Sequence, residues 1–314
     1  DQYRADRNPA DLIFRARALV HFAVDPSQVY MTTALEKSQT RFLPFNQGTG
    51  GPGRQGGAGN PTNPSGYTTS YLWERVWERG AWLELLGSFI HAQDGKVLFP
   101  RFHQWDAVRS LIAATLRDGA GTNRLVQHSA GSGKSNTIAW TAHALSRLHG
   151  VDNAPLFDKV IVITDRRVLD RQLQETVAGL EHTPGTIVRI DKDSHQLRDA
   201  LSGHAARVII TTLQKFPVVA QLAADLVGQQ FAVIVDEAHS STSGEAIKQL
   251  QAVLSPAEVA SLVAEAGDEE IDGTDVITAS AAARRARENL TYLAFTATPK
   301  AKTPNLFGQP SPQD

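Results

Sequence analysis

Residues 128–135, His-Ser-Ala-Gly-Ser-Gly-Lys-Ser, lie between a short apolar stretch and an apolar-periodic one. This order predicts a strand, a phosphate-binding loop and a helix. The glycines let successive backbone N–H groups turn towards an anion, and the helix adds the positive end of its dipole. Lys134 supplies a charge for the β- and γ-phosphates of a nucleotide, and the Ser135 hydroxyl is a ligand for Mg²⁺. We expect the phosphate contacts from the following residues: Ala130, Gly131, Ser132, Gly133, Lys134 and Ser135.

A second motif supplies the partner that such a loop needs. Residues 231–239, Phe-Ala-Val-Ile-Val-Asp-Glu-Ala-His, form an apolar run that ends in two carboxylates. Asp236 is expected to hold Mg²⁺ through water, and Glu237 to orient or deprotonate the water that attacks the γ-phosphate. The strict phosphate-loop pattern has glycine where His128 stands, so the loop alone is a weaker signal. The two carboxylates of the second motif strengthen the interpretation as a nucleotide site. The predicted reaction is ATP hydrolysis.

Composition excludes several classes of protein. The chain has 314 residues, which favours two folding units, and its net charge of -2 is not that of a polycation. Any nucleic-acid contact is therefore expected from a local basic track.

The chain has no cysteine, which excludes disulfides and thiolate metal sites and predicts a reducing compartment, the cytoplasm. No apolar run approaches the roughly 20 residues that span a bilayer, so no membrane partner is expected. The polar start without Met suggests an internal cut.

The second part of the chain is typical of a doubly wound α/β domain with a parallel sheet. Short, nearly continuous apolar runs alternate with helix-capable sequence, as expected of strands that are buried on both faces. The runs are Leu125–Val126, Val160–Thr164, Val208–Thr212, Phe231–Val235 and Tyr292–Thr296. Ligands of such folds bind at the carboxyl ends of the strands, where the loop, the carboxylates and Thr296 fall.

The first part, residues 1–94, has a different character. Residues 18–33 contain two candidate strands, broken by the turn signal Asp25-Pro26. Residues 48–66 are rich in Gly, Pro, Asn, Thr and Ser and predict a long surface loop. Residues 71–90 predict a packed helix or helix pair, and a domain boundary is expected near residue 94. The apolar positions at near-helical spacing are Leu72, Val76, Leu83, Leu86 and Ile90, with Trp73, Trp77 and Trp82 expected in packing.

The segment Arg101-Phe-His-Gln104 opens a helix upstream of the loop. Gln104 is a candidate for a bidentate contact with the adenine edge, with Phe102 or Arg101 stacking on the ring. The alternative role for Gln104 is a cap of its helix.

The motifs together resemble the first motor domain of superfamily 2 helicases and translocases. Residues 164–173, 211–216, 236–239 (Asp-Glu-Ala-His) and 296–299 (Thr-Ala-Thr-Pro) occur in that family's order. More narrowly, QHSAGSGKSNTIAW, RFLPFNQG, VDPSQVYMTT and residues 59–74 are similar to the R subunit of type I restriction enzymes. The likeness covers nearly the whole chain, and His128 at the first loop position is usual in that family.

The resemblance implies a RecA-like P-loop NTPase domain at residues 95–314, preceded by the C-terminal part of a restriction-nuclease-like α/β domain. It implies a subunit that uses ATP to translocate double-stranded DNA, cleaves it with a separate nuclease domain, and assembles with methylation and specificity subunits. His239 would couple hydrolysis to motion by contacting Thr296 and Thr298. The residues that match segments touching the DNA backbone are Arg166, Arg167, Thr211 and Thr212. The alternatives are a satisfied core histidine at 239 and an ordinary solvated surface at the arginines.

Two parts of that family's pattern are missing from these residues. We find no convincing Glu-x-Lys set for a nuclease, so its catalytic residues are expected outside this chain. The sequence also stops soon after Thr298, before a second motor domain that would contribute an arginine finger. We therefore expect a fragment with a nucleotide half-site and no translocation or cleavage of its own. Two other functions stay open: another superfamily 2 motor, and a non-enzymatic module that binds DNA or partner subunits.

Overall fold

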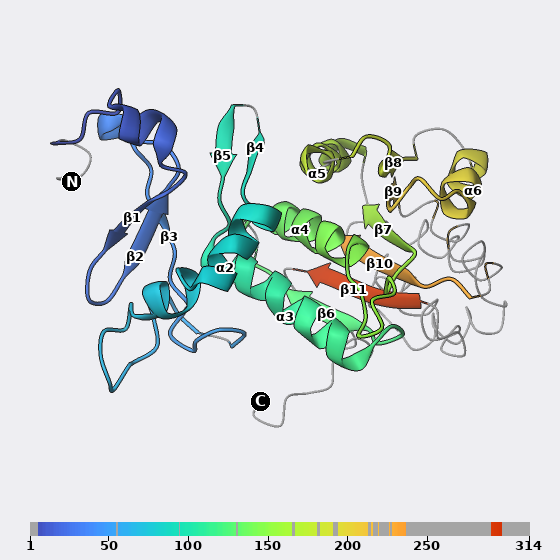
Figure 1. The fold of residues 1–314 in the computed structure, drawn as a ribbon, viewed down its shortest axis with the longest axis horizontal. Helices are drawn as coiled ribbons and strands as arrows, with labels where there is room; N and C mark the ends of the chain where they lie inside the picture. The colour runs from blue at the N-terminus through green and yellow to red at the C-terminus, as the bar shows by residue number, and fades with distance from the viewer. Residues whose placement is uncertain are drawn as a thin grey trace, which may run out of the picture. The chain divides into compact units, whose positions relative to one another are not determined.

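The fold was analysed in a computed structural model (Figure 1). It describes residues 6–54, 56–93, 95–129, 131–164, 167–180, 183–190, 194–212, 228–236 and 290–296, with the single residues 215, 219 and 226. The side chains of residues 167–172 and 194 are not among those described. The chain forms two compact units, Asp1–Ser110 and Leu111–Asp314, and each is described here by itself.

The second unit is built on a six-stranded sheet whose order is β6-β11-β10-β7-β9-β8. Every neighbouring pair of strands is parallel, which confirms the predicted α/β class with a parallel sheet. The strands are β6 (Arg124–Gln127), β7 (Lys159–Thr164), β8 (Ile187–Arg189), β9 (Val208–Thr212), β10 (Phe231–Asp236) and β11 (Leu290–Thr296). Both β7 and β11 are buried along their whole length, as their apolar sequences require.

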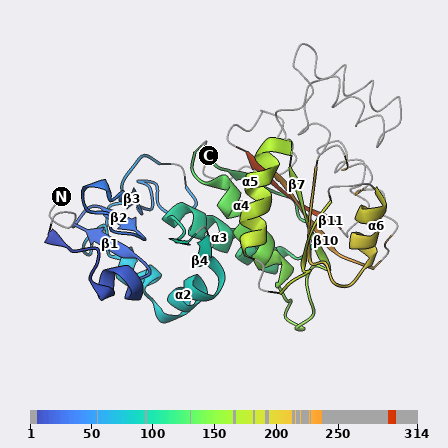
Figure 2. The ribbon, with the colours of Figure 1, turned by 90° about the horizontal axis from the view of Figure 1, so that it is seen from above.

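Helices cover both faces of this sheet. They are α4 (Lys134–Ser146), α5 (Arg167–Gly179) and α6 (Ser194–Ser202). Figure 2 shows α4 and α5 on one face and α6 on the other, as right-handed crossovers between parallel strands require. Two of these helices bury apolar side chains at helical spacing: Ile138, Ala142 and Leu145 in α4, and Leu173 and Val177 in α5.

The first unit contains a small antiparallel sheet of β1 (His21–Val24), β2 (Val29–Thr32) and β3 (Leu43–Pro44). The predicted turn joins β1 to β2, because the Asp25 carboxylate accepts hydrogen bonds from the backbone N–H groups of Ser27 at 2.7 Å and Gln28 at 2.9 Å. These bonds lower the pKa of Asp25. The helical turn η1 (Ile13–Arg17) precedes β1, and the turn η2 (Lys37–Gln39) lies between β2 and β3.

The Gly- and Pro-rich segment 48–66 contains no helix or strand among its described residues, as predicted. It is nevertheless tied to the hairpin. The Asn60 side chain donates to the Ser27 carbonyl and to Asn46 Oδ1, both at 2.9 Å, and its Oδ1 accepts from the Gln47 N–H at 2.9 Å. One asparagine therefore satisfies backbone groups that the loop could not pair by itself.

Residues 71–90 form helical segments with a break, the helix pair of the two arrangements that the sequence left open. They form η3 (Leu72–Val76), α2 (Arg79–Glu84) and η4 (Leu85–Phe89). The break at Glu78, whose carboxylate caps α2 by accepting from the Ala81 N–H at 3.0 Å, shifts the helical phase. Leu72 and Val76 are fully buried, as predicted. Leu83 and Leu86 are 57% and 40% exposed, and Leu85 and Phe89 are buried in their place.

The tryptophans predicted to pack do so at Trp77 and Trp82, whose rings contact those of Phe22 and Phe99. Trp73 and Trp77 are 44% and 46% exposed, and the fully buried tryptophan of the first unit is Trp105. The Trp105 ring lies 5.8 Å from the Phe102 ring in an edge-to-face contact. The core of this unit is therefore aromatic and centred on the start of helix α3 (Phe102–Asp118).

The boundary expected near residue 94 falls at the turn of a hairpin of β4 (His91–Gln93) and β5 (Lys96–Leu98). By compactness the two units divide further along, between Ser110 and Leu111, within α3. None of the described helices is sufficiently long and apolar for a transmembrane span.

The packing of α4 gives a stability prediction. Leu145 is fully buried, so Leu145→Ala should lower the free energy of unfolding by about 2–5 kcal/mol through lost contacts and a residual cavity. Leu116, in α3, is 49% exposed, and Leu116→Ala should change it by less than about 0.5 kcal/mol. Urea unfolding measures both values, and equal losses would contradict the assigned core.

Candidate nucleotide site

The loop between β6 and α4 has the backbone that phosphate binding needs. Gly131 and Gly133 have φ values of 72° and 85°, the left-handed region that favours glycine. Gly133 is the N-cap of α4, and helix begins at Lys134. A Cβ added at Gly131 would meet no atom within 4 Å, so the loop is open there. The helix N-terminus and this open turn form a cradle suited to an anion.

The predicted loop cation and the predicted metal carboxylate lie together. Lys134 Nζ is 3.2 Å from Asp236 Oδ1, and the two side chains are 13% and 21% exposed. Asp236 is the last residue of β10, and β11 lies between β10 and β6 in the sheet (Figure 1). Parallel register therefore brings together residues that are about a hundred positions apart in the sequence.

The residues at this point fit a nucleotide with Mg²⁺. Ser135 is half-buried in the first turn of α4, and Asp236 offers carboxylate oxygens beside the loop. Hydroxyl, carboxylate and phosphate oxygens are the ligands that Mg²⁺ prefers. Among the described residues no cluster of three or more His, Asp or Glu forms a metal site by itself, so a metal here would depend on phosphate oxygens and water.

His128 is the first residue after β6 and is only 5% exposed. Its backbone N–H donates to the carbonyl of Thr296 at 2.8 Å. Its ring nitrogens contact Ser132 Oγ in the loop and Thr137 Oγ1 in α4, the latter at 3.1 Å. Sequence reasoning singled out His128 only as a departure from a pattern and did not identify Thr137.

The candidate adenine residues all belong to the first unit. Gln104 Oε1 accepts from the Arg101 N–H at 2.8 Å, so the helix-capping role that the sequence left open is present. Phe102 is 1% exposed and packs against Phe45, Tyr71 and Trp105. The aromatic core therefore accounts for Phe102, and of the two stacking candidates only the half-buried Arg101 has surface to offer.

The other predicted residues lie at the carboxyl edge of the sheet or outside the described residues. Thr296 ends β11 and is 5% exposed, and Thr211 and Thr212 end β9. Thr164, at the end of the adjacent β7, has a buried hydroxyl, as does Thr211, and neither has a hydrogen-bond partner in the described structure. Arg167 begins α5, but its side chain is not described. The predicted residues outside the described ranges are Ala130, Arg166, Glu237, His239 and Thr298.

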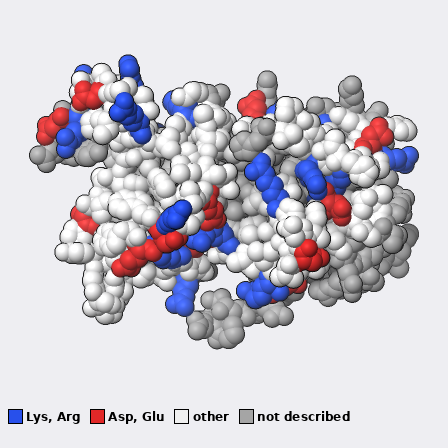
Figure 3. Space-filling model, viewed as in Figure 1, with Lys and Arg blue, Asp and Glu red and all other residues white. Residues whose placement is uncertain are grey.

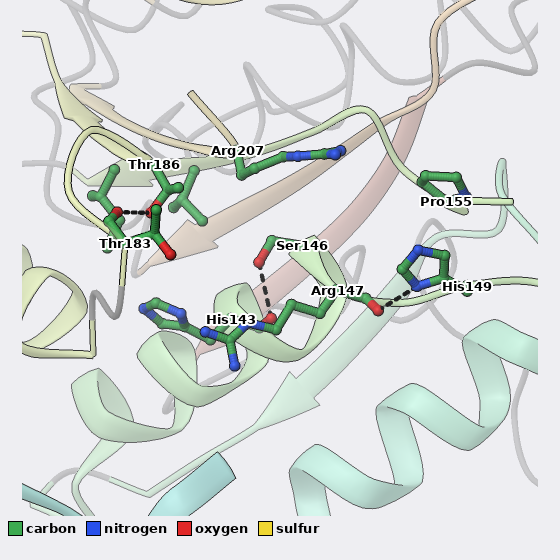
Figure 4. Close-up of a pocket in the computed structure, with 10 residues that line it drawn as sticks. His143, Ser146, Arg147, His149, Pro155, Thr183, Thr186 and Arg207 are labelled. Carbon is green, nitrogen blue, oxygen red and sulfur yellow. Dashed lines mark hydrogen bonds between the residues drawn. The ribbon is translucent and has the colours of Figure 1, made fainter. Parts of the chain in front are cut away.

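A pocket of about 230 Å³ lies elsewhere in the second unit, at the amino ends of β8 and β9 and the C-terminal end of α4 (Figure 4). Its lining includes Arg147, Arg207, His143 and His149. Parallel strands carry their functional loops at the carboxyl edge, so this pocket is not the nucleotide site.

Figure 3 shows the described Lys and Arg side chains interspersed with Asp and Glu on one face, as the small net charge predicts.

The sequence profile of SWI2/SNF2 ATPases matches residues 103–310, which include the loop, Lys134 and Asp236. The chain belongs to the SWI2/SNF2 ATPase family. The second unit is thus the RecA-like domain of a superfamily 2 ATPase, as the motif order suggested.

Individual relatives of this SWI2/SNF2 ATPase domain were also found. The chain is 31% identical over 155 residues to the Type I restriction enzyme HindI endonuclease subunit of Haemophilus influenzae, covering 46% of this chain and 14% of that protein. It therefore spans only a small part of that distant homologue. Among solved structures, the UvsW helicase from bacteriophage T4 is similar over 74% of this chain and 66% of its own, with TM-score 0.42 and 16% identity. A nuclease-deletion mutant of the Type ISP restriction-modification enzyme LlaGI is similar over 63% and 17%, with TM-score 0.38 and 16% identity.

The loop backbone gives a second prediction. Gly133→Ala forces a Cβ into a left-handed conformation and should lower the free energy of unfolding by about 1–2 kcal/mol. Gly179, at the end of α5, has open space for a Cβ, so Gly179→Ala should be neutral or stabilise by up to about 1 kcal/mol. Chemical denaturation of both variants compares the two positions. An unchanged stability of Gly133→Ala would contradict the loop conformation.

Proposed function

We propose that this chain carries the ATP-hydrolysing half-site of the R subunit of a type I restriction enzyme, a motor that translocates double-stranded DNA and cleaves it. The observation that carries the proposal is the 3.2 Å approach of Lys134 to Asp236 at the open loop before α4. Membership of the SWI2/SNF2 ATPase family supports nucleotide hydrolysis, and the likeness to the HindI endonuclease subunit supports the narrower assignment.

In this proposal the chain's own residues divide the work between binding and positioning. Lys134 and the loop backbone hold the triphosphate. Ser135 and Asp236 would hold Mg²⁺, which neutralises charge on the phosphates when bound. Glu237 orients or deprotonates the attacking water. Phosphoryl transfer asks little covalent work of a protein, so placing these groups supplies most of the catalysis.

Coupling to DNA rests on the carboxyl edge of the same sheet. His239 would sense the nucleotide and contact Thr296 and Thr298. The proposed DNA-backbone contacts come from Arg166 and Arg167, which follow β7, and from Thr211 and Thr212 at the end of β9. Such contacts to phosphate carry no base information, which suits a motor that moves on any sequence.

The assembly is proposed on the same grounds. Residues 1–94 would be the rear part of a nuclease-like domain and residues 95–314 the first motor domain. The whole protein would act in the cytoplasm with methylation and specificity subunits. The second motor domain would add the remaining half of the nucleotide site.

Hydrolysis by the full-length protein, with and without duplex DNA, tests the proposal. Lys134→Ala should remove nucleotide binding because it deletes the loop cation. Glu237→Gln should still bind nucleotide but hydrolyse it about 10²–10⁴-fold more slowly, the usual contribution of a positioned general base. Lys96→Ala, at an exposed position of β5, is the matched control and should leave the rate unchanged.

The outcomes separate the alternatives. A hydrolysis rate that Lys134→Ala leaves intact would favour a non-enzymatic module that binds DNA or partner subunits. DNA-dependent hydrolysis without any cleavage in the presence of methylation and specificity subunits would favour another superfamily 2 motor.

A further inference from the structure

His128 stands at the junction of three elements that surround the nucleotide site. It directly follows β6, and its backbone N–H donates to the Thr296 carbonyl at the end of the neighbouring β11 (Figure 1). The strict loop pattern has glycine at this position, which could make the same backbone bond but nothing more. The imidazole therefore adds contacts that the backbone alone does not provide.

The ring joins the loop to the helix behind it. One nitrogen, Nδ1, contacts Ser132 Oγ, which also contacts the Ser129 carbonyl within the loop. The other, Nε2, lies 3.1 Å from Thr137 Oγ1, one turn into α4. Thr137 is fully buried and His128 is 5% exposed, so water does not compete strongly with this bond.

The hydroxyl protons indicate one arrangement of donors. Ser132 has a single hydroxyl proton, and its close contact with the Ser129 carbonyl uses it, so Ser132 Oγ accepts from the Nδ1–H of His128. Nε2 is then an acceptor for the Thr137 hydroxyl, whose alternative acceptor, the Gly133 carbonyl, is farther away at 3.5 Å. A neutral imidazole with the proton on Nδ1 satisfies each of these groups.

We propose that His128 is a positioning residue that holds the phosphate loop in its binding shape before nucleotide arrives. The inference rests on the proposed nucleotide site and deepens it. Because the Ser132–His128–Thr137 bridge fixes loop to helix in the free protein, less ordering remains for binding. Loss of the bridge should therefore weaken ground-state nucleotide binding and leave the chemical step unchanged, since none of the three side chains is assigned to the attacking water.

Nucleotide affinity of the full-length protein, measured with a fluorescent ATP analogue, tests this role. Thr137→Val removes one hydroxyl with little change of shape and should raise Kd about 3- to 10-fold, the value of one buried hydrogen bond. His128→Ala should raise Kd about 10-fold or more, and His128→Gln, which can still reach Thr137, should recover part of the loss. KM for ATP should rise in parallel, with kcat within about twofold of wild type.

The matched control is Thr141→Val, one turn further along α4. Thr141 is also fully buried, and its hydroxyl donates to the Thr137 carbonyl at 2.8 Å, away from the loop. Its Kd should stay within about twofold of wild type. The double variant His128→Ala/Thr137→Val should have the same Kd for nucleotide as His128→Ala alone, because both changes break the same bridge.

The result has separate readings for the site and for the bridge. If wild type binds no nucleotide, the proposed function fails. If wild type binds, Lys134→Ala does not, and Thr137→Val and His128→Ala bind as tightly as wild type, the role of His128 alone is overturned. If the rise in Kd of the double variant equals the product of the rises in the two single variants, the two side chains act independently, and the bridge is overturned. Urea unfolding of each variant checks that it is folded. If His128→Ala does not fold, the affinity of Thr137→Val decides the test.

Discussion

The site depends on the parallel register of three strands. Asp236 at the end of β10 pairs with Phe295 of β11, and Thr296 of β11 pairs with Gln127 of β6, directly before the loop. This alignment brings the carboxylate of one strand end within 3.2 Å of the ammonium that begins α4. A slip of one residue in either pairing would turn these side chains to the opposite face and separate the two charges. The buried, apolar character of the strands is therefore a requirement of the chemistry as well as of the fold.

Much of this sheet could be predicted because its signal is local and strong. Five apolar runs bounded by turn residues correspond to β6, β7, β9, β10 and β11. The edge strand β8 was not predicted, since it is three residues long and only half-buried, so burial imposes no apolar run on it. In residues 71–90 the apolar spacing identified the buried Leu72 and Val76. After them the cap at Glu78 restarts the helix and buries Leu85 and Phe89 in place of Leu83 and Leu86. Periodicity cannot detect such a phase change when both sets are apolar.

The site shows the same division between local and long-range information. The left-handed turns at Gly131 and Gly133 and the helix start at Lys134 follow from residues adjacent in the chain. The cap that Gln104 provides is also local, because it joins residues three positions apart. From the sequence alone this cap and a contact with adenine were both open. The bridge from His128 to Thr137 depends on ring orientation in a folded interior, which no spacing rule encodes. Its sequence signal was the presence of a large polar residue where a loop of this kind permits glycine.

In the proposed function, nucleotide and DNA both bind at the carboxyl edge of one sheet. The proposed nucleotide residues lie at or just after the ends of β6 and β10, whereas the proposed DNA contacts lie at or just after the ends of β7 and β9, the next strands along. These sites share an edge but no strand. The strands β10 and β7 are direct neighbours, and the apolar run of each is buried, so the two proposed sites lie next to each other along one edge. The buried hydroxyls of Thr164 and Thr211, at the ends of β7 and β9, have no hydrogen-bond partner in the described structure, so this edge retains polar groups that a bound ligand could satisfy.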